Sequence, residues 1–293
     1  MNMKPIRLLF AAALVLLGLA ACDKEDAPVL TPETDITAGF DPDFAKRLQE
    51  RGIIANATHI TYADVADITE LDISGEENDW EEGKGLTSLK GIEYFTSLTM
   101  LECYWNQLTS LDLSRNTALT ELWCEENQLT ALDVSKNTSL TELHCYSNQL
   151  TALDVSRNTA LTCLNCCTNP LTVLDVSRNT ALTELYCYSN QLTVLDVSRN
   201  TALTELSCVD NRLTVLDLSR NTTLVWLFCN NNQLATLDLS RNTALTLLHC
   251  ENNPGKEGFF EITRWPGSEL KAGMESWEYD GKPVAVKYLG NGE

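Results

Sequence analysis

The chain has 293 residues and a formal net charge of −20, with 41 acidic against 21 basic side chains. Its length allows one or two domains. The negative charge makes it a poor candidate for binding DNA or RNA, whose phosphates need lysine and arginine, and an anionic lipid surface would repel it.

Residues 1–21 have the pattern of a secretory signal peptide. Lys4 and Arg7 precede an apolar run over residues 8–21, which is shorter than the roughly 20 residues that an ordinary membrane-spanning helix needs. The run ends in Leu-Ala-Ala-Cys, and this tetrapeptide resembles the lipobox of bacterial lipoproteins. The resemblance implies cleavage before Cys22 and lipid attachment to its thiol. An ordinary secretory signal followed by a chance cysteine is the alternative.

Residues 22–40 are expected to form a flexible acidic tether. The sequence Asp-Lys-Glu-Asp at residues 23–26 resembles the surface-export signal of some Gram-negative lipoproteins, and a plain solvated linker is the alternative. Pro28 and Pro32 fit an extended leash that holds the folded body clear of the membrane. The resemblance implies a protein that is lipid-anchored in the bacterial outer membrane and exposed on the cell surface.

Residues 41–85 are expected to cap the N-terminal end of the fold. Asp41 followed by Pro42 predicts the start of a short helix, with Phe44 and Leu48 on one face and Gly52 able to end it. Residues 54–58 lack the acidic ligands that calcium needs, so no metal site and no cofactor are predicted. An acidic, exposed excursion is expected at residues 76–85.

Eight cysteines recur at a spacing of 21 residues, which marks a tandem repeat. These ladder cysteines are Cys103, Cys124, Cys145, Cys166, Cys187, Cys208, Cys229 and Cys250. Seven 21-residue units cover residues 108–254, and a 22-residue variant precedes them at residues 86–107. The repeat predicts one elongated domain of eight repeats over residues 86–254.

The apolar residues of each unit stand in fixed columns. In the unit at residues 129–149, Leu143 and Cys145 alternate with His144, as on a β-strand. No unit can bury its apolar side chains alone, but stacked units form a continuous core. The pattern Leu-x-x-Leu-x-Cys-x-x-Asn resembles the leucine-rich repeat, and its 21-residue cysteine form is similar to the repeats of internalin J and its relatives. The resemblance implies a β-rich solenoid with a parallel sheet on its concave side.

The two halves of each unit resemble each other, so we expect extended segments on both sides and little helix. One asparagine column follows the ladder cysteines by three residues, from Asn106 to Asn253, and a second runs from Asn116 to Asn242. Both are expected to satisfy backbone groups of neighbouring coils. The ladder cysteines are expected to pack as small reduced hydrophobes, because in-register side chains aim their sulfurs badly for disulfides.

Residues 255–293 leave the repeat and are expected to form an irregular C-terminal cap. Residues 277–288 predict a hairpin that turns at Asp280 and Gly281. Phe259, Phe260 and Trp265 are candidates to cover the last coil of the core.

The columns that vary between units are those expected to face outward from the concave strands. They carry aromatic and acidic residues, and aromatic rings on a rigid surface are typical contact anchors for proteins and also stack on sugars. Neutral drift on a tolerant face is the alternative. The candidate ligand-binding residues are Tyr104, Trp105, Glu121, Trp123, Glu142, Tyr146, Glu184, Tyr186, Tyr188, Glu205, Trp226 and Phe228.

Cys163 and Cys167 replace residues of other types in two of these columns. Both are expected to face outward, on either side of Asn165. Four residues along a strand span roughly 13 Å, which is too far for a mutual disulfide.

The sequence gives no support for an enzyme. His144 and His249 lie five coils apart, and the chain has no nucleophile elbow, phosphate loop or HExxH motif. We predict a monomeric, surface-anchored adhesion protein that binds a protein or glycan on a host or neighbouring cell, with no catalytic residues. The alternatives are a structural or envelope-complex surface protein without a specific soluble ligand, and a carbohydrate-handling accessory component.

Overall fold

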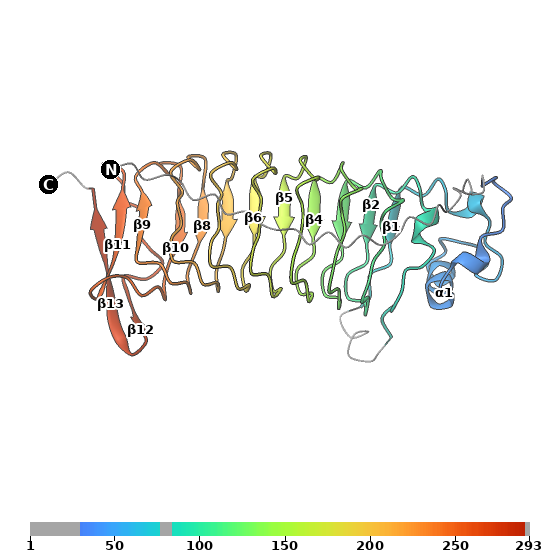
Figure 1. Cartoon of the computed structure of the whole chain (residues 1–293), viewed down its shortest axis with the longest axis horizontal. Coiled ribbons are helices and arrows are strands. Elements are labelled where there is room, and N and C mark those ends of the chain that lie inside the picture. The colour runs from blue at the N-terminus through green and yellow to red at the C-terminus, as the bar shows by residue number, and fades with distance from the viewer. Residues whose placement is uncertain (1–29, 77–83, 291–293) are drawn as a thin grey trace, which may run out of the picture. The chain divides into compact units, whose positions relative to one another are not determined.

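The computed structural model describes residues 30–76 and 84–290. The chain divides into two units, Met1–Leu30 and Thr31–Glu293, and every helix and strand of the described residues belongs to the second. The predicted signal peptide, Cys22 and residues 22–29 of the predicted tether lie outside the described residues, as do residues 77–83 of the predicted excursion. In the described part of the tether, Ile36 and Phe40 are buried. The unit Thr31–Glu293 is a β-solenoid whose coils stack side by side (Figure 1).

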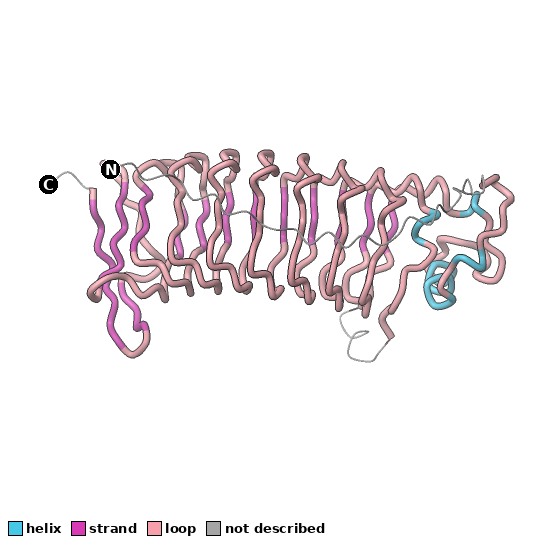
Figure 2. The backbone as a smooth tube through the Cα atoms, in the orientation of Figure 1, coloured by secondary structure: helices cyan, strands magenta, loops and turns pink. Residues whose placement is uncertain are grey.

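One side of the solenoid is a nine-stranded parallel sheet with the order β1-β2-β3-β4-β5-β6-β7-β8-β10. Each strand is short and long loops join it to the next, as the magenta segments of Figure 2 show. The strands are β1 (Glu70–Asp72), β2 (Met100–Glu102), β3 (Glu121–Trp123), β4 (Glu142–His144), β5 (Cys163–Asn165), β6 (Glu184–Tyr186), β7 (Glu205–Ser207), β8 (Trp226–Phe228) and β10 (Leu247–His249). The buried central leucine of each strand pairs with that of the next, for example Leu122 with Leu143. The predicted parallel solenoid is confirmed.

The sheet has one strand more than the eight that the cysteine spacing predicts. β1 pairs in register with β2, and Leu71 lies opposite Leu101. Ile73 is buried at the position that a ladder cysteine holds in later coils. The sequence prediction missed this coil because isoleucine replaces the cysteine that marks the others.

Asparagine side chains join each coil to the one before it. Asn127 shows the pattern: its Oδ1 accepts the backbone N–H of Leu108 at 2.9 Å, and its Nδ2 donates to the Cys103 carbonyl at 3.0 Å. Asn158, in the second column, donates through Nδ2 to the carbonyls of Val134 and Asn137 at 3.0 and 2.8 Å. Both columns are buried and bind the backbone, as predicted from the sequence.

The ladder cysteines form a further continuous column inside the coils, beside the two asparagine columns. All are fully buried, and the cysteines of the described residues are free thiols. Burial raises the pKa of the Cys166 and Cys208 thiols to about 12. Because the thiolate is the reactive form, these thiols are chemically inert at neutral pH.

The back of the coils, at residues 111–116 and their equivalents, is less regular than predicted. A strand forms there only at β9 (Thr236–Leu239) within the described ranges, whereas the other coils make turns. In each turn an aspartate accepts the backbone N–H two residues later, as Asp154 Oδ1 does from Ser156 at 2.9 Å. The same bond forms in the coil of β9, where Asp238 accepts from Ser240, so the aspartate does not prevent a strand; β9 differs because β11 (Phe259–Arg264) pairs with it.

The N-terminal end is covered by the helix α1 (Pro42–Glu50), which begins where predicted. Asp41 caps the helix by accepting the backbone N–H groups of Asp43 and Phe44. Phe44 packs on the rings of Phe40 and Phe95, over the first coils. Short 3-10 turns lie at Thr37–Gly39, Tyr62–Asp64 and Ile92–Tyr94. No helix in residues 30–76 and 84–290 is long and apolar enough to cross a membrane.

The C-terminal end is covered by a second sheet with the order β12-β13-β11-β9. β11 (Phe259–Arg264) pairs in parallel with β9 and with β13 (Lys282–Leu289), and β12 (Ser276–Tyr279) forms with β13 the predicted antiparallel hairpin. Phe260 is buried against Trp277, whereas Phe259 is exposed and Trp265 half-buried. Of the three aromatic residues proposed to cover the last coil, Phe260 is the one that is buried.

Replacing Asn158 with Ala should destabilise the fold. The change leaves two buried carbonyls without their side-chain donor, which costs about 1–3 kcal/mol in the free energy of unfolding. Chemical denaturation measures the loss. Thr159→Ala, an exposed neighbour, is the control and should change stability by less than about 0.5 kcal/mol. Equal stability of the two variants would refute a structural role for this column.

Candidate ligand-binding face

The outward side chains of the long parallel sheet form one surface, which we call the strand face. It comprises the first and third residues of strands β2 to β8 and β10, and the two residues that follow each ladder cysteine. Buried leucines and cysteines alternate with these positions and hold them in place. Equivalent side chains of neighbouring coils lie about 4.8 Å apart. The strand face is therefore a rigid array with the spacing of a β-sheet.

The strand face carries acidic residues and neither lysine nor arginine. Its acidic members are Glu102, Glu121, Glu125, Glu126, Glu142, Glu184, Glu205, Asp210 and Glu251. One basic residue of each of seven repeats lies instead in the turn at the back of the coil, from Arg115 to Arg241, next to the aspartates there; Lys90 and Arg212 lie outside these turns. Segregation of charge leaves the strand face with a negative charge that nearby bases do not balance.

Like charges stand opposite each other in this sheet. Glu121 pairs in register with Glu142, and Glu184 pairs with Glu205. Directly opposed like charges on neighbouring strands destabilise a sheet by a few tenths of a kcal/mol. Tyr186 reduces the repulsion between Glu184 and Glu205, because its hydroxyl donates to both carboxylates.

Aromatic residues occur along the strand face, and the ring contacts lie in its first and last coils, with Tyr146, Tyr186 and Tyr188 between them. Trp123 stacks on His144 with ring centroids 4.2 Å apart, and Tyr104 meets Trp105 edge to face at 5.4 Å. In the last coils Phe228 stacks on His249 at 5.2 Å. β2 and β8 are six strands apart, or about 29 Å. A ligand that contacts both groups must therefore be extended or large.

The predicted ligand-binding residues differ in how far the solvent reaches them. Trp226 is 43% exposed and Tyr188 is 37% exposed. The other ten are half-buried between side chains of neighbouring coils: Tyr104, Trp105, Glu121, Trp123, Glu142, Tyr146, Glu184, Tyr186, Glu205 and Phe228. Trp226 and Tyr188 are thus the most accessible of the predicted anchors.

The expectation that Cys163 and Cys167 are exposed is wrong. Cys167 is fully buried, and Cys163 is 9% exposed and donates to Glu184 from Sγ at 3.7 Å. Both occupy outward columns, but the larger side chains of the coils on either side close over them. Burial raises the pKa of the Cys163 thiol to about 12, so neither position offers a reactive thiolate.

Glu125 is a buried acidic residue of the strand face that was not among the predicted ligand-binding residues. It is only 4% exposed, and Tyr104 and Tyr146 hold the same position in the coils before and after it. Burial raises the pKa of the Glu125 carboxyl to about 7, and the carboxylates of Glu102 and Glu126 act in the same direction. A glutamate between two tyrosines, in a column with one other glutamate at Glu251, was the available sequence signal.

The C-terminal cap closes one end of the strand face. Gly273 lies directly against His249 and Glu251, and any side chain at this position would collide with them. Glycine therefore permits the close approach. The cap thus covers Glu251, whereas Leu247 at the start of β10 stays exposed.

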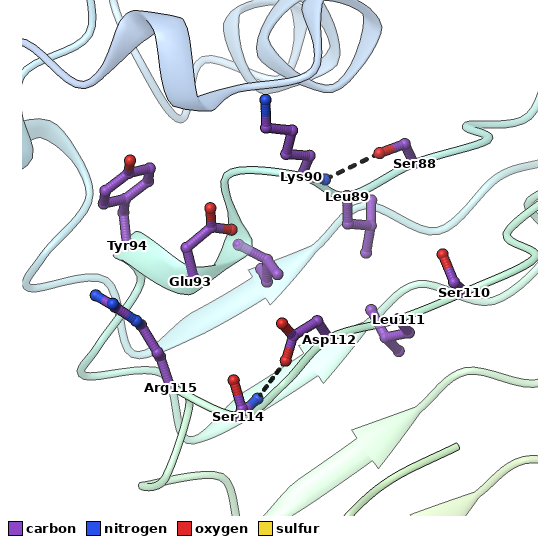
Figure 3. Close-up of a pocket in the computed structure, with 11 residues that line it drawn as sticks. Ser88, Leu89, Lys90, Glu93, Tyr94, Ser110, Leu111, Asp112, Ser114 and Arg115 are labelled. Atoms are coloured by element: carbon purple, nitrogen blue, oxygen red, sulfur yellow. Dashed lines mark hydrogen bonds between the residues drawn. The ribbon is translucent and has the colours of Figure 1, made fainter. Parts of the chain in front are cut away.

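A surface cavity of about 390 Å³ lies elsewhere, beside the first coils (Figure 3). Lys90, Arg115, Glu93 and Asp112 line it, so its charges are mixed. Its carboxylates already accept backbone N–H groups, Glu93 from Gly91 and Asp112 from Ser114. In residues 30–76 and 84–290 no three His, Cys, Asp or Glu side chains are grouped to hold a metal ion. The strand face is the stronger candidate for binding.

Glu125 should make stability depend on pH. Its folded-state pKa of about 7 lies above the ordinary value of 4.5, so its contribution to stability is fully present below about pH 4.5 and is lost as pH rises through 7. Glu125→Gln should therefore gain up to about 3 kcal/mol over the unchanged chain between pH 4.5 and about pH 8. Urea unfolding at both pH values measures the difference. Glu126→Gln is the control, and an equal gain there would contradict the assignment.

Comparison with known proteins identifies the fold's relatives. No family model matches the chain, and no curated protein does. The functional domain of InlJ from Listeria monocytogenes, which includes a cysteine ladder, is 40% identical with a TM-score of 0.72. The match covers 83% of this chain and 55% of that one, so the chain spans little more than half of that structure.

Two more distant structures share the fold alone. Internalin C2 of Listeria monocytogenes is 22% identical, with a TM-score of 0.56 over 90% of this chain and 100% of that one. The leucine-rich-repeat ectodomain of the Arabidopsis thaliana receptor kinase GASSHO1/SCHENGEN3, in complex with CASPARIAN STRIP INTEGRITY FACTOR 2, is 21% identical. Its TM-score is 0.57 over 69% of this chain and 27% of that one. With its 21-residue coils, parallel sheet and column of buried thiols, the chain is a leucine-rich-repeat protein with a cysteine ladder, similar in structure to the functional domain of InlJ.

Proposed function

We propose that the chain binds a protein ligand through the strand face. Leucine-rich-repeat solenoids use their extended sheet surface for binding, and the plant receptor ectodomain of this fold was solved in complex with CASPARIAN STRIP INTEGRITY FACTOR 2. The observation that carries the proposal is the segregation of charge: the strand face is acidic and aromatic and has no lysine or arginine, while most bases of the repeats lie at the back. A partner with a basic surface complements it.

A glycan is the second candidate ligand. Trp226 and Tyr188 present exposed rings on which a sugar can stack, and neighbouring carboxylates can accept its hydroxyl groups. The carboxylates of the strand face favour a cationic protein over a neutral sugar, because a neutral sugar brings no positive charge to balance them. The protein ligand is therefore our first choice.

We further propose adhesion at the bacterial cell surface as the setting for this binding. The lipobox-like residues ending at Cys22 and the acidic stretch after it support lipid anchoring in the outer membrane with outward display. The net charge of −20 opposes self-association and supports a monomer.

Trp226→Ala should weaken ligand binding by about 30-fold, as expected for an aromatic anchor worth about 2 kcal/mol. Trp226 is a better probe than Trp123, whose ring stacks on His144 and so also stabilises the fold. Arrays of proteins and glycans, probed with the full chain, first identify the ligand, and surface plasmon resonance then measures the affinity. Because Trp226 is exposed, the melting temperature of the variant should change little.

Val194→Ala is the matched control, since Val194 is an apolar residue of the back side that is 71% exposed. It should leave the affinity unchanged. Equal affinities of the two variants would remove the strand face as the binding site. Arrays without any ligand would favour a structural role in the envelope instead.

Cys22→Ser should abolish lipid attachment, because no thiol remains at the position that the lipobox pattern marks. Cells grown with radiolabelled palmitate should label the unchanged chain and leave the variant unlabelled and released from the membrane. Protease treatment of intact cells should digest the unchanged chain if it is displayed outward. A labelled variant, or a protected chain, would contradict the anchor or the display respectively.

A further inference from the structure

Two coils place a buried glutamate at the same position, directly after the ladder cysteine. Glu125 is 4% exposed and Glu251 is 6% exposed. They differ in what surrounds them. Oε1 of Glu251 lies 3.1 Å from Nδ1 of His249, a group able to carry positive charge. Oε2 of Glu125 is buried and has no hydrogen-bond partner among the described residues.

The residue that corresponds to His249 in the earlier coil is Trp123. Its Nε1 is also buried without a hydrogen-bond partner in the described part of the chain. Trp123 is the last residue of β3, and Glu125 follows it two residues later on the other side of the inward Cys124, so both side chains leave the strand face with Cα atoms about 7 Å apart. An unused donor and an unused acceptor therefore stand side by side on the strand face.

Leaving such groups unpaired is costly. A buried polar group without a partner destabilises the folded chain, and a buried carboxylate does so more strongly. The chain's own surroundings increase the cost, because Glu102 and Glu126 are the charged neighbours that act on Glu125 and both are negative. A positive group brought by a partner would remove the penalty that His249 removes for Glu251.

The residues on either side of Glu125 are suited to bind an organic cation such as a guanidinium. Tyr104 and Tyr146 hold the positions on either side of Glu125 and are half-buried. Burial raises the pKa of the Tyr146 phenol to about 12, so its ring stays neutral and keeps the electron-rich face that attracts cations. A guanidinium stacks well on such rings and donates to a carboxylate at the same time.

We propose that Glu125, between Tyr104 and Tyr146, is a subsite for an arginine or lysine side chain of the protein ligand, with a ligand carbonyl accepting from Trp123 Nε1. The inference rests on the proposed function and names the chemistry of the partner: a segment of protein with a basic residue. A sugar hydroxyl would leave the carboxylate charge unbalanced. A calcium ion needs six or more oxygen ligands, and one carboxylate with no grouped partners among the described residues does not provide them.

The test uses a tetra-arginine peptide, acetylated and amidated, and the same peptide with neutral citrulline in place of arginine. Calorimetric titration of the full chain at about pH 8 keeps Glu125 ionised. Glu125→Gln should lower the affinity for tetra-arginine by about tenfold or more, the value of a charge-assisted hydrogen bond at a buried site. The citrulline peptide should bind weakly to both forms.

Two control variants distinguish specific binding of the peptide at Glu125 from non-specific attraction of the cationic peptide to an acidic protein. Glu126→Gln and Glu251→Gln remove the same charge nearby or at the same position, and each should lower the affinity by less than about twofold because non-specific attraction is screened by salt. Equal losses in all three variants, or an equal loss for the citrulline peptide, would overturn the subsite. Melting curves confirm that the Glu125→Gln chain is folded.

Failure of the subsite and failure of the proposed function give different results. A ligand from the arrays that binds Glu125→Gln normally but fails to bind Trp226→Ala would refute the subsite and retain the strand face. Selective loss of tetra-arginine binding in Glu125→Gln, with arrays that yield no ligand, would retain the subsite and refute adhesion.

Discussion

The register of the coils depends on the ladder asparagines, the column from Asn106 to Asn253 that follows the ladder cysteines by three residues. Each ladder asparagine accepts a backbone N–H from the preceding coil and donates to carbonyls of that coil and its own, as Asn127 does with Leu108, Cys103 and Cys124. Because the amide uses both of its ends, it fixes the coil in one register. A slip by one residue would turn every inward side chain outward.

The fixed register of the coils also determines which side chains lie next to each other on the strand face. Equivalent positions stack about 4.8 Å apart, so one residue type repeated between units becomes a row of like groups. The glutamate pairs of the strand face are the result, and they act against stability. The fold tolerates them because burial of the leucine and cysteine columns supplies far more free energy than the pairs cost. Such a local conflict is expected where a surface serves binding.

Periodicity predicts most of this architecture from the sequence. The cysteine spacing gives the coil length, Asp41-Pro42 gives the helix start and Asp280-Gly281 gives the hairpin turn. The coil of β1 escapes prediction because Ile73 fills the cysteine position. The back of the coils repeats the strand motif, yet within the described ranges a strand forms there only at β9, because β11 of the C-terminal cap pairs with it.

The candidate surface is less predictable than the fold, because burial on it is set by neighbours. The sequence places Cys167 and Glu125 in an outward column, and this is correct. It cannot show that both are buried between tyrosines of the adjoining coils, since that depends on the width of side chains 21 residues away. Alternation gives the direction of a side chain, whereas exposure depends on the size of the residues next to it.

A stack of identical layers has no intrinsic end. The carbonyl of Asn253, in the last coil, accepts a hydrogen bond at 2.8 Å from the indole Nε1 of Trp277 in the C-terminal hairpin. The indole thus stands where a further layer would otherwise dock. Without the Trp277 indole, the last coil would present free backbone acceptors to the first coil of another molecule, and head-to-tail fibres could grow. The hairpin therefore keeps the protein finite as well as stable.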